Sequence, residues 1–279
     1  MRILKKILLF LFRLFVKVNF YYGIALILSI LTKPLNPKRK YKVLSLIKPV
    51  FSNDLDEIKK VESDLQFLSF PRLLLSEIVK KYALDFSKLN DASYHPIMDG
   101  TKEQEKIYFV IKKVFKHLKK IIKFDAIFAG NYVYVSQQEF FKIAKEENIP
   151  VIILYKEGMF PAPITKEKSD KLYAGKKFVG NKFLVYNNII KNILLDAKIP
   201  GIEKEILEVV GMPRLDSYLN NISIKEIKNT IDHFYKVLNR QDHNQQAPFN
   251  SFSQEDETKR SEVMQRIFYL TQIEPGSDY

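Results

Sequence analysis

Residues suited to chemistry follow the apolar runs of this chain. Lys156, Glu157 and Gly158 come directly after the apolar run 150–155 (PVIILY). A carboxylate there, beside a lysine and a glycine that lets a ligand approach the backbone, is suited to act as a general base toward a hydroxyl group. The alternative is an ion pair that ties down the following loop. Glu157 is therefore the candidate catalytic residue, and Lys156 and Gly158 are candidate binding residues.

A second group has the pattern G-x-P-R-x-D over 211–216, again directly after an apolar run. Gly211 permits a tight exit from a strand, Pro213 stiffens the chain, and Arg214 offers a planar fork for phosphate or carboxylate. Asp216 is placed to cap a following helix. The same spacing suits a rigid turn with an internal bridge between Arg214 and Asp216. Spacing alone favours the turn, and both residues stay candidates for substrate binding.

Amide side chains follow three other apolar runs. They are Asn53, Asn131 with its neighbour Tyr132, and Asn187. Asn131 is expected to head a helix whose free backbone amides attract an anion or a sugar hydroxyl. The chain has neither a P-loop nor a G-x-G-x-x-G fingerprint, so nucleotide binding through those loops is not supported. Without cysteine, and with four scattered histidines, we expect neither a metal site nor a cofactor.

The elements that must position these residues follow an α/β pattern. The apolar runs 124–129 and 150–155, separated by the amphipathic segment 135–147, indicate parallel strands covered on both faces. Further strands are predicted at 42–50, 65–70, 183–186 and 207–210, further helices from 55 onward and at 73–82, 104–122 and 189–196, and an irregular connection at 92–101. This pattern predicts a doubly wound, Rossmann-like parallel sheet of about six strands, in which ligands bind at the carboxyl ends.

The first part of the chain is apolar from residue 3 to residue 31 and almost free of acids. Its cations fall on one arc of a helical wheel: Arg2, Lys5, Lys6, Arg13 and Lys17. The longest uncharged stretch, 18–32, is shorter than the roughly 20 residues that a membrane-spanning helix needs. We therefore expect an amphipathic helix that lies on an anionic lipid surface, and keep a signal-anchor or spanning helix and a buried core helix as alternatives.

In that orientation aromatic side chains reach the acyl chains and cations meet the headgroups. The aromatic residues are Phe10, Phe12, Phe15 and Phe20, and the lysines and arginine of 33–42 extend the positive collar toward the cytoplasmic side. The formal net charge is +13, which is typical of proteins with an anionic partner. Lipid is favoured over nucleic acid, because no nucleic-acid-binding motif accompanies the lysines.

The helix predicted at 104–122 carries lysines on the side expected to be exposed: Lys112, Lys113, Lys116, Lys119 and Lys120. They form either a solvated face or a further membrane-facing patch. Along the chain we expect a membrane-interface helix and basic collar at 1–40, a Rossmann-like domain at 41–220, a helix and linker at 221–250, and a remnant or the start of a second domain at 251–279.

A resemblance to a known family covers 125–218, about a third of the chain. This stretch contains AGNYVYVSQQEFFKIAKEENIPVIILYKEGMFP and EVVGMPRLDSY. It resembles bacterial surface-carbohydrate glycosyltransferases of the two-domain GT-B type and, more distantly, the CDP-glycerol glycerophosphotransferases that build teichoic acid chains. The G-x-P-R-x-D element is its most specific part. Where the glycerophosphotransferases carry a His-Gly pair whose histidine acts as base, this chain has Glu157-Gly158.

The resemblance implies that the amino-terminal domain binds the acceptor and docks on the membrane, while a carboxyl-terminal domain binds the nucleotide-sugar donor. The expected protein is then the acceptor-binding half of a glycosyltransferase for capsule, lipopolysaccharide or related glycans, peripheral on the cytoplasmic face of the bacterial inner membrane. Its partners would be anionic lipid, a lipid-linked or oligosaccharide acceptor, and a separate donor-domain polypeptide. The alternatives are a non-catalytic membrane-bound scaffold or truncated pseudoenzyme of this family, and a glycerophosphotransferase of the teichoic-acid type.

Overall fold

The structure, a computed structural model, describes residues 2–48, 52–155 and 166–216. The chain divides into two compact units, Met1–Gly211 and Met212–Tyr279. Of the second unit only 212–216 is described. The predicted segments 221–250 and 251–279 therefore lie outside the described residues, as do Lys156, Glu157 and Gly158.

The first unit is built on one sheet of seven strands in the order β1-β3-β2-β4-β5-β6-β7. From β3 to β7 every neighbouring pair is parallel, while β1 joins the edge antiparallel to β3. The strands are β1 (Lys33–Pro34), β2 (Tyr41–Ser45), β3 (Leu65–Ser69), β4 (Ala126–Ala129), β5 (Val151–Leu154), β6 (Lys182–Val185) and β7 (Leu207–Val209). The predicted α/β class and all six predicted parallel strands are confirmed.

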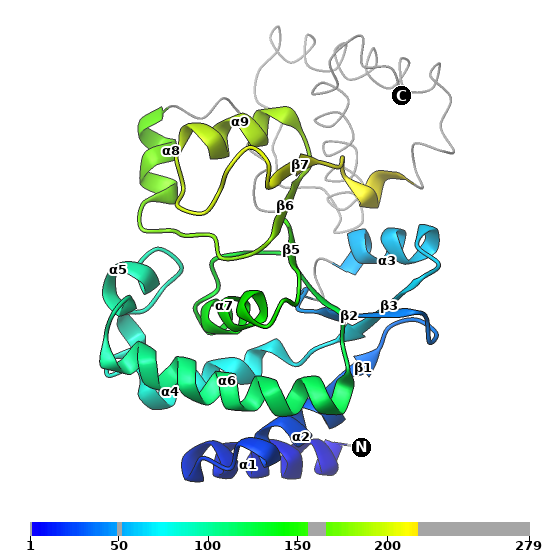
Figure 1. The fold of residues 1–279 in the computed structure, drawn as a ribbon, viewed down its shortest axis with the longest axis vertical. Coiled ribbons are helices and arrows are strands. Elements are labelled where there is room, and N and C mark those ends of the chain that lie inside the picture. Colours follow the sequence, from blue (N-terminus) through cyan, green and yellow to red (C-terminus); the bar gives the residue numbers. More distant parts are fainter. Residues whose placement is uncertain (1, 49–51, 156–165, 217–279) are drawn as a thin grey trace, which may run out of the picture. The chain divides into compact units, whose positions relative to one another are not determined.

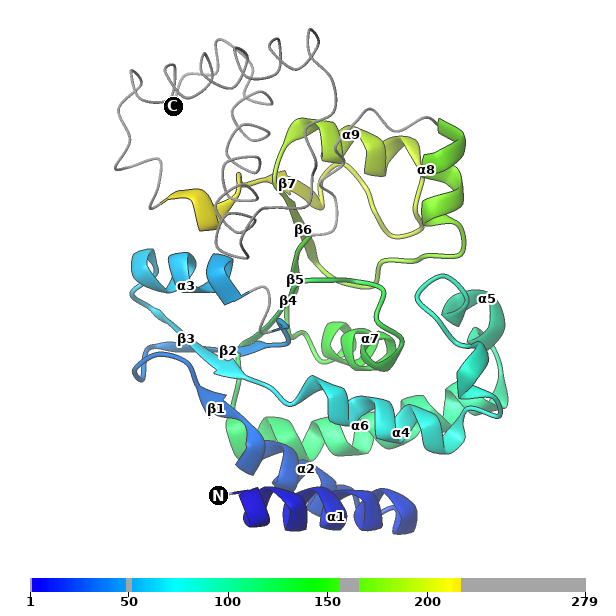
Figure 2. The ribbon, with the colours of Figure 1, turned by 180° about the vertical axis from the view of Figure 1, so that it is seen from behind.

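Helices cover both faces of this sheet. They are α1 (Arg2–Val18), α2 (Tyr21–Leu31), α3 (Ser52–Val61), α4 (Leu75–Tyr82), α5 (Tyr94–Met98), α6 (Lys102–Ile122), α7 (Gln138–Glu146), α8 (Lys166–Tyr173) and α9 (Asn188–Asp196). Short 3₁₀ turns are η2 (Arg72–Leu74), η3 (Phe86–Lys88), η4 (Val135–Gln137) and η5 (Pro213–Leu215). Figures 1 and 2 show α3 on one face, with α6, α7 and α9 on the other. The described elements thus have the doubly wound arrangement of a Rossmann-like fold.

The sequence explains where the long helix α6 begins and ends. Its N-cap is Thr101, whose hydroxyl accepts a hydrogen bond from the backbone N–H of Gln104, 3.1 Å away. It ends at Lys123, which takes the left-handed conformation with φ 55°. Of its predicted exposed lysines, two face α7 instead: Lys112 lies 3.2 Å from Glu146 and Lys119 lies 3.8 Å from Glu147. Lys113, Lys116 and Lys120 are exposed as predicted.

The apolar segment 3–31 forms two helices instead of one. The break falls at Asn19, which has a φ of 59°, and Phe20. Helix α2 packs into the core, and Gly23 permits its approach to α1, because a Cβ there would lie 2.5 Å from the rings of Phe15 and Phe20. Helix α2 therefore buries one side in the core, as the alternative of a buried core helix expects, while Tyr22, Leu26 and Ile30 on its other side are exposed.

Helix α1 is apolar on two sides. Phe12 and Val16, one turn apart, are buried in the same core as α2, with Phe12 0% exposed. The expectation that Phe12 inserts among acyl chains is wrong, because this side of α1 faces the domain. Phe10 and Phe20 are exposed, and Phe15 meets Phe20 edge to face. Among the described residues, no helix has both the length and the apolar character that crossing a bilayer requires.

Substitutions on the two sides of α1 should change the free energy of unfolding by very different amounts. Replacing Phe12 with Ala should lower the free energy of unfolding by about 3–5 kcal/mol, since it leaves a cavity in the core. Replacing Phe10, which is 68% exposed, with Ala should change it by no more than about 0.5 kcal/mol. Urea unfolding followed by circular dichroism measures both. Equal effects of the two substitutions would contradict the docking of α1 on the domain.

Candidate functional site

The strand order reverses between β2 and β4. The chain leaves β2 toward β3 on one side, whereas it leaves β4 toward β5 on the other. In open parallel sheets, ligands bind at the carboxyl ends of the strands at such a reversal. Ser45 at the end of β2 pairs with Phe128 of β4, so the residues after these two strands meet at one edge. We call this place the switch-point edge.

Two cations and one phenol ring come together at the switch-point edge. Lys48 follows β2, Arg72 begins η2 after β3, and Tyr134 precedes η4 after β4. The Lys48 Nζ lies 4.3 Å from the centroid of the Tyr134 ring, and the Arg72 guanidinium carbon lies 5.4 Å from it. Burial lowers the pKa of Arg72 and Tyr134 acts against this shift, yet a guanidinium stays protonated in proteins. The two cations beside the phenol ring thus present positive charge suited to phosphate or carboxylate.

Unsatisfied amide groups lie in the same turn. Asn131 and Gln137 are both buried. The Asn131 Nδ2 and both amide atoms of Gln137 have no hydrogen-bond partner among the described residues. A buried polar group without a partner costs about 1–3 kcal/mol. The Nδ2 of Asn131 and the Nε2 of Gln137 are donors that suit a hydroxyl or a phosphate oxygen, and the Oε1 of Gln137 is an acceptor that suits a hydroxyl.

Asn131 does not have the predicted local role. Its Oδ1 accepts a hydrogen bond from the backbone N–H of Val133, 2.8 Å away. This side-chain turn occupies the position just after β4, and η4 begins only at Val135. The expectation that Asn131 heads a helix is therefore wrong. The neighbouring Tyr132 is buried, with its ring against the rings of Tyr155 and Phe183.

A buried carboxylate joins the edge from the other face of the sheet. Asp54, in the first turn of α3, is fully buried, and the hydroxyl of Tyr186 donates to its Oδ2 over 3.0 Å. Tyr186 directly follows β6. The sequence places Ser52, Asn53 and Asp54 together after the first strand, and of these we selected Asn53, which is exposed, as the candidate binding residue. The structure shows that the buried polar group of this turn is Asp54 instead.

The remaining predicted site residues have local roles or lie in the second unit. Asn187 caps α9, because its Oδ1 accepts a hydrogen bond from the backbone N–H of Ile190 over 2.9 Å. Gly211 has a φ of 73°, which supports the predicted tight exit after β7. In the second unit, Arg214 is half-buried within η5 and Asp216 is exposed at its end. The structure thus gathers Asn131, Tyr132 and Asn187 near the strand ends, with Asn53 on α3.

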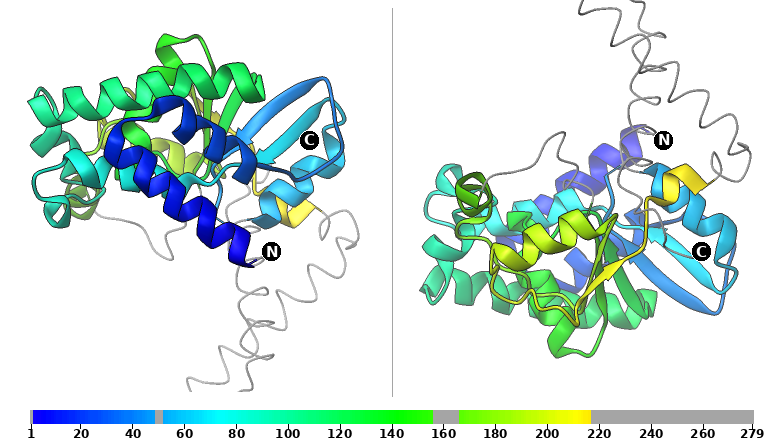
Figure 3. Two further views of the ribbon diagram at one scale, coloured as in Figure 1. Left: turned by 90° about the horizontal axis from the view of Figure 1, so that it is seen from below. Right: turned by 90° about the horizontal axis from the view of Figure 1, so that it is seen from above.

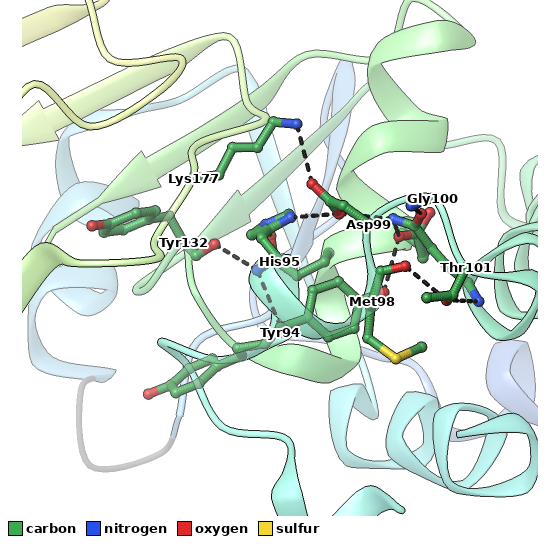
Figure 4. Close-up of polar contacts among 12 residues, drawn as sticks. Tyr94, His95, Met98, Asp99, Gly100, Thr101, Tyr132 and Lys177 are labelled. Atoms are coloured by element: carbon green, nitrogen blue, oxygen red, sulfur yellow. Dashed lines mark hydrogen bonds and ion pairs between the residues drawn. The ribbon is translucent and has the colours of Figure 1, made fainter. Parts of the chain in front are cut away.

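A second polar cluster lies around α5. It was not predicted, because the sequence of 92–101 indicated an irregular connection. Figure 4 shows His95 and Lys177 directed toward Asp99. His95 Nδ1 lies 3.0 Å from Asp99 Oδ1, and its Nε2 lies 3.0 Å from Gln138 Oε1. The amide nitrogen of Gln138 donates to the carbonyl of Tyr132 over 2.7 Å, so its oxygen faces His95 as an acceptor.

Asp99 is surrounded by donors. Lys177 Nζ lies 3.6 Å from its Oδ2, and Gln104 donates to its Oδ1 over 3.0 Å. Burial raises the pKa of Asp99, but the hydrogen bonds and charges of His95, Lys177 and Gln104 outweigh burial and hold the pKa below its ordinary 3.8. Gln104 also donates to the buried carboxylate of Glu139. The cluster therefore ties α5 to α6 and α7, and its charged groups are paired with one another.

A pocket of about 560 Å³ opens beside this cluster and is lined in part by His95, Asp99 and Tyr173. Within the described ranges, no three His, Cys, Asp or Glu side chains gather closely enough to hold a metal ion. The chain matches no model of a known protein family, and no curated protein matches it. The switch-point edge, with its unpaired amides and its cations, is the stronger candidate site.

The fall of the free energy of unfolding at low pH should depend on Asp99. Because the pKa of Asp99 is lowered in the folded protein, its charged form stabilises the fold above the unfolded value of about 3.9, and this contribution is lost as the pH falls through the folded value. Asp99→Asn should therefore be destabilising near neutral pH and should lose less stability than wild type below about pH 4. Urea unfolding at several pH values measures this. Parallel curves for the two proteins would contradict the role given to Asp99.

Proposed function

We propose that this chain is the acceptor-binding half of a membrane-associated glycosyltransferase of bacterial surface-polysaccharide synthesis. The enzyme would move a sugar from a nucleotide-activated donor to a hydroxyl of a lipid-linked or oligosaccharide acceptor. The observation that carries the proposal is the switch-point edge, where Lys48 and Arg72 flank Tyr134. A Rossmann-like sheet agrees with this family but is shared by many others, so the family assignment itself rests on the resemblance of 125–218.

The groups at the switch-point edge match the parts of such an acceptor. A lipid-linked acceptor carries a phosphate or diphosphate, which two cations at one site bind well. Sugar hydroxyls both donate and accept hydrogen bonds, and the amides of Asn131 and Gln137 offer the complementary atoms. Glu157 follows β5, the neighbour of β4, and we propose it as the general base toward the acceptor hydroxyl.

Membrane attachment is proposed through α1. Large apolar side chains at three- and four-residue intervals form an exposed stripe: Ile3, Ile7, Phe10, Leu14 and Val18. Lys6, Arg13 and Lys17 lie along one side of this stripe on the helical wheel. In the view from below in Figure 3, α1 lies across the unit. A continuous apolar stripe with flanking cations suits the cytoplasmic face of a membrane rich in anionic lipid.

Loss of the cations at the switch-point edge should weaken acceptor binding without unfolding the protein. Arg72→Ala combined with Lys48→Ala should weaken binding of a polyprenyl diphosphate in detergent micelles by at least about tenfold, since two charge-assisted contacts are lost. Titration calorimetry measures the affinity. Lys145→Ala on the exposed side of α7 is the matched control and should bind as wild type does. Unchanged affinity of the double variant would remove this edge from acceptor binding.

Vesicle binding should depend on the exposed stripe. Phe10→Ser with Leu14→Ser should lower the affinity for vesicles of phosphatidylcholine with phosphatidylglycerol by at least about tenfold, because two large side chains lose their burial among acyl chains. Co-sedimentation measures the affinity. Ile189→Ser removes an equally exposed side chain on α9 and should leave binding unchanged. Equal losses in both proteins would show that the stripe is not the membrane surface.

A further inference from the structure

A second pocket lies at the joint between α1 and α2. It has a volume of about 550 Å³ and is bounded by this joint, by Tyr82 at the end of α4 and by the first turns of α6. Tyr21 and Phe109 line it and meet edge to face, with their ring centroids 6.2 Å apart. The pocket therefore has an aromatic wall where the amino-terminal helices turn.

The charged residues of the pocket come from α6. Lys102 and Lys106 are one turn apart, so they lie on the same side of the helix. Both are exposed, and neither has an ion pair or a side-chain hydrogen bond within the part of the chain that the structure describes. Glu105 lies in the same pocket. The pocket thus offers two ammonium groups and one carboxylate, a net charge suited to a singly charged anion that also carries hydroxyl groups.

The joint that shapes the pocket is held by polar contacts of its own. Asn19 Oδ1 accepts a hydrogen bond from Lys81 Nζ over 2.7 Å and another from the hydroxyl of Tyr82. Lys81 Nζ also donates to the carbonyl of Val16 near the end of α1, over 2.7 Å. These contacts fix the end of α1 against α4. The pocket is therefore formed before any ligand enters, which lowers the entropic cost of binding.

The place of the pocket indicates its occupant. The exposed stripe of α1 ends at Val18, next to Asn19, and exposed aromatic side chains continue it at Phe20 and Tyr22. A molecule with a phosphate group and an apolar tail would meet both surfaces. We propose that this pocket binds the headgroup of phosphatidylglycerol, the anionic glycerophospholipid whose headgroup alcohol is glycerol, with its phosphate between Lys102 and Lys106 and its glycerol hydroxyls donating to Glu105. This inference rests on the membrane association proposed above and adds a preferred headgroup.

Helix α6 carries its own control for this proposal. Lys116 and Lys120 are also exposed, four residues apart and on the same side of the helix as Lys102 and Lys106, but they do not line the pocket. Each pair contributes two charges to the general attraction toward an anionic surface. Lys102→Gln with Lys106→Gln and Lys116→Gln with Lys120→Gln therefore change the net charge equally. Only the first pair removes the phosphate ligands of the pocket.

The experiment compares the full-length wild type and both double variants on two kinds of vesicle. Both contain phosphatidylcholine with the same share of anionic lipid, phosphatidylglycerol in one and phosphatidylserine in the other, so their surface charge is matched. On phosphatidylglycerol, the Lys102/Lys106 variant should bind at least about fivefold more weakly than the Lys116/Lys120 variant, because both variants lose the same general attraction and only the first also loses the charge-assisted contacts to the phosphate. On phosphatidylserine the difference between the two variants should be smaller, because the serine headgroup has no glycerol hydroxyls to donate to Glu105 and carries a carboxylate that Glu105 repels.

Equal binding of the two variants on phosphatidylglycerol would overturn the headgroup pocket and leave only general electrostatic attraction. A fivefold difference that is the same on both lipids would overturn the role of the glycerol hydroxyls and of Glu105. If the wild type binds neither vesicle, the membrane association proposed above fails together with this inference. Circular dichroism of both variants shows whether the fold is retained.

Discussion

The structure depends on parallel pairing between β2 and β4, two strands that are distant in sequence. The backbone N–H of Asp125 donates to the carbonyl of Lys42 and that of Leu46 donates to Phe128, each over 2.8 Å. Because β2 connects to β3 on one side and β4 to β5 on the other, this pairing creates the reversal of strand order. The reversal separates the loops that follow these strands. It thereby leaves room at the carboxyl ends for a ligand.

The sequence predicted the six parallel strands because both faces of this sheet are covered, so each strand reads as a short, almost continuous apolar run. Strand β1 and helix α5 are among the elements that escaped this reasoning. Strand β1 has only two residues and includes Pro34, which is tolerated at an edge of the sheet and carries no apolar pattern. Helix α5 has five residues including Pro96, and is held by tertiary contacts of Tyr94 with Glu139 and of His95 with Gln138. Contacts of that kind leave no periodic signal.

The sequence predicted that the candidate site lies at the carboxyl ends of the strands, but it did not predict which side chains meet there. Asn131 and Asn187 do follow strands, but the Oδ1 of each accepts a hydrogen bond from a backbone N–H of its own turn. An asparagine after a strand can either make such a local hydrogen bond or bind a ligand, and its position in the sequence does not decide between the two. Lys48 was predicted to lie within a strand over 42–50, whereas β2 ends at Ser45. Its approach to Tyr134 and Arg72 joins three separate segments. Only the register of the sheet brings these three side chains together.

The two-sided character of α1 bears on how a lipid surface would be recognised. An amphipathic segment that folds only at the membrane loses conformational entropy at the moment of binding, and this loss weakens its affinity. Here the burial of Phe12 and Val16 keeps α1 folded against the domain, and Lys81 fixes its end. The conformational entropy of α1 is therefore lost when the domain folds. The exposed stripe, the flanking cations and the pocket at the joint are then already arranged before the protein would meet a lipid surface. The helix that completes the core on one side thus presents a rigid apolar surface on the other.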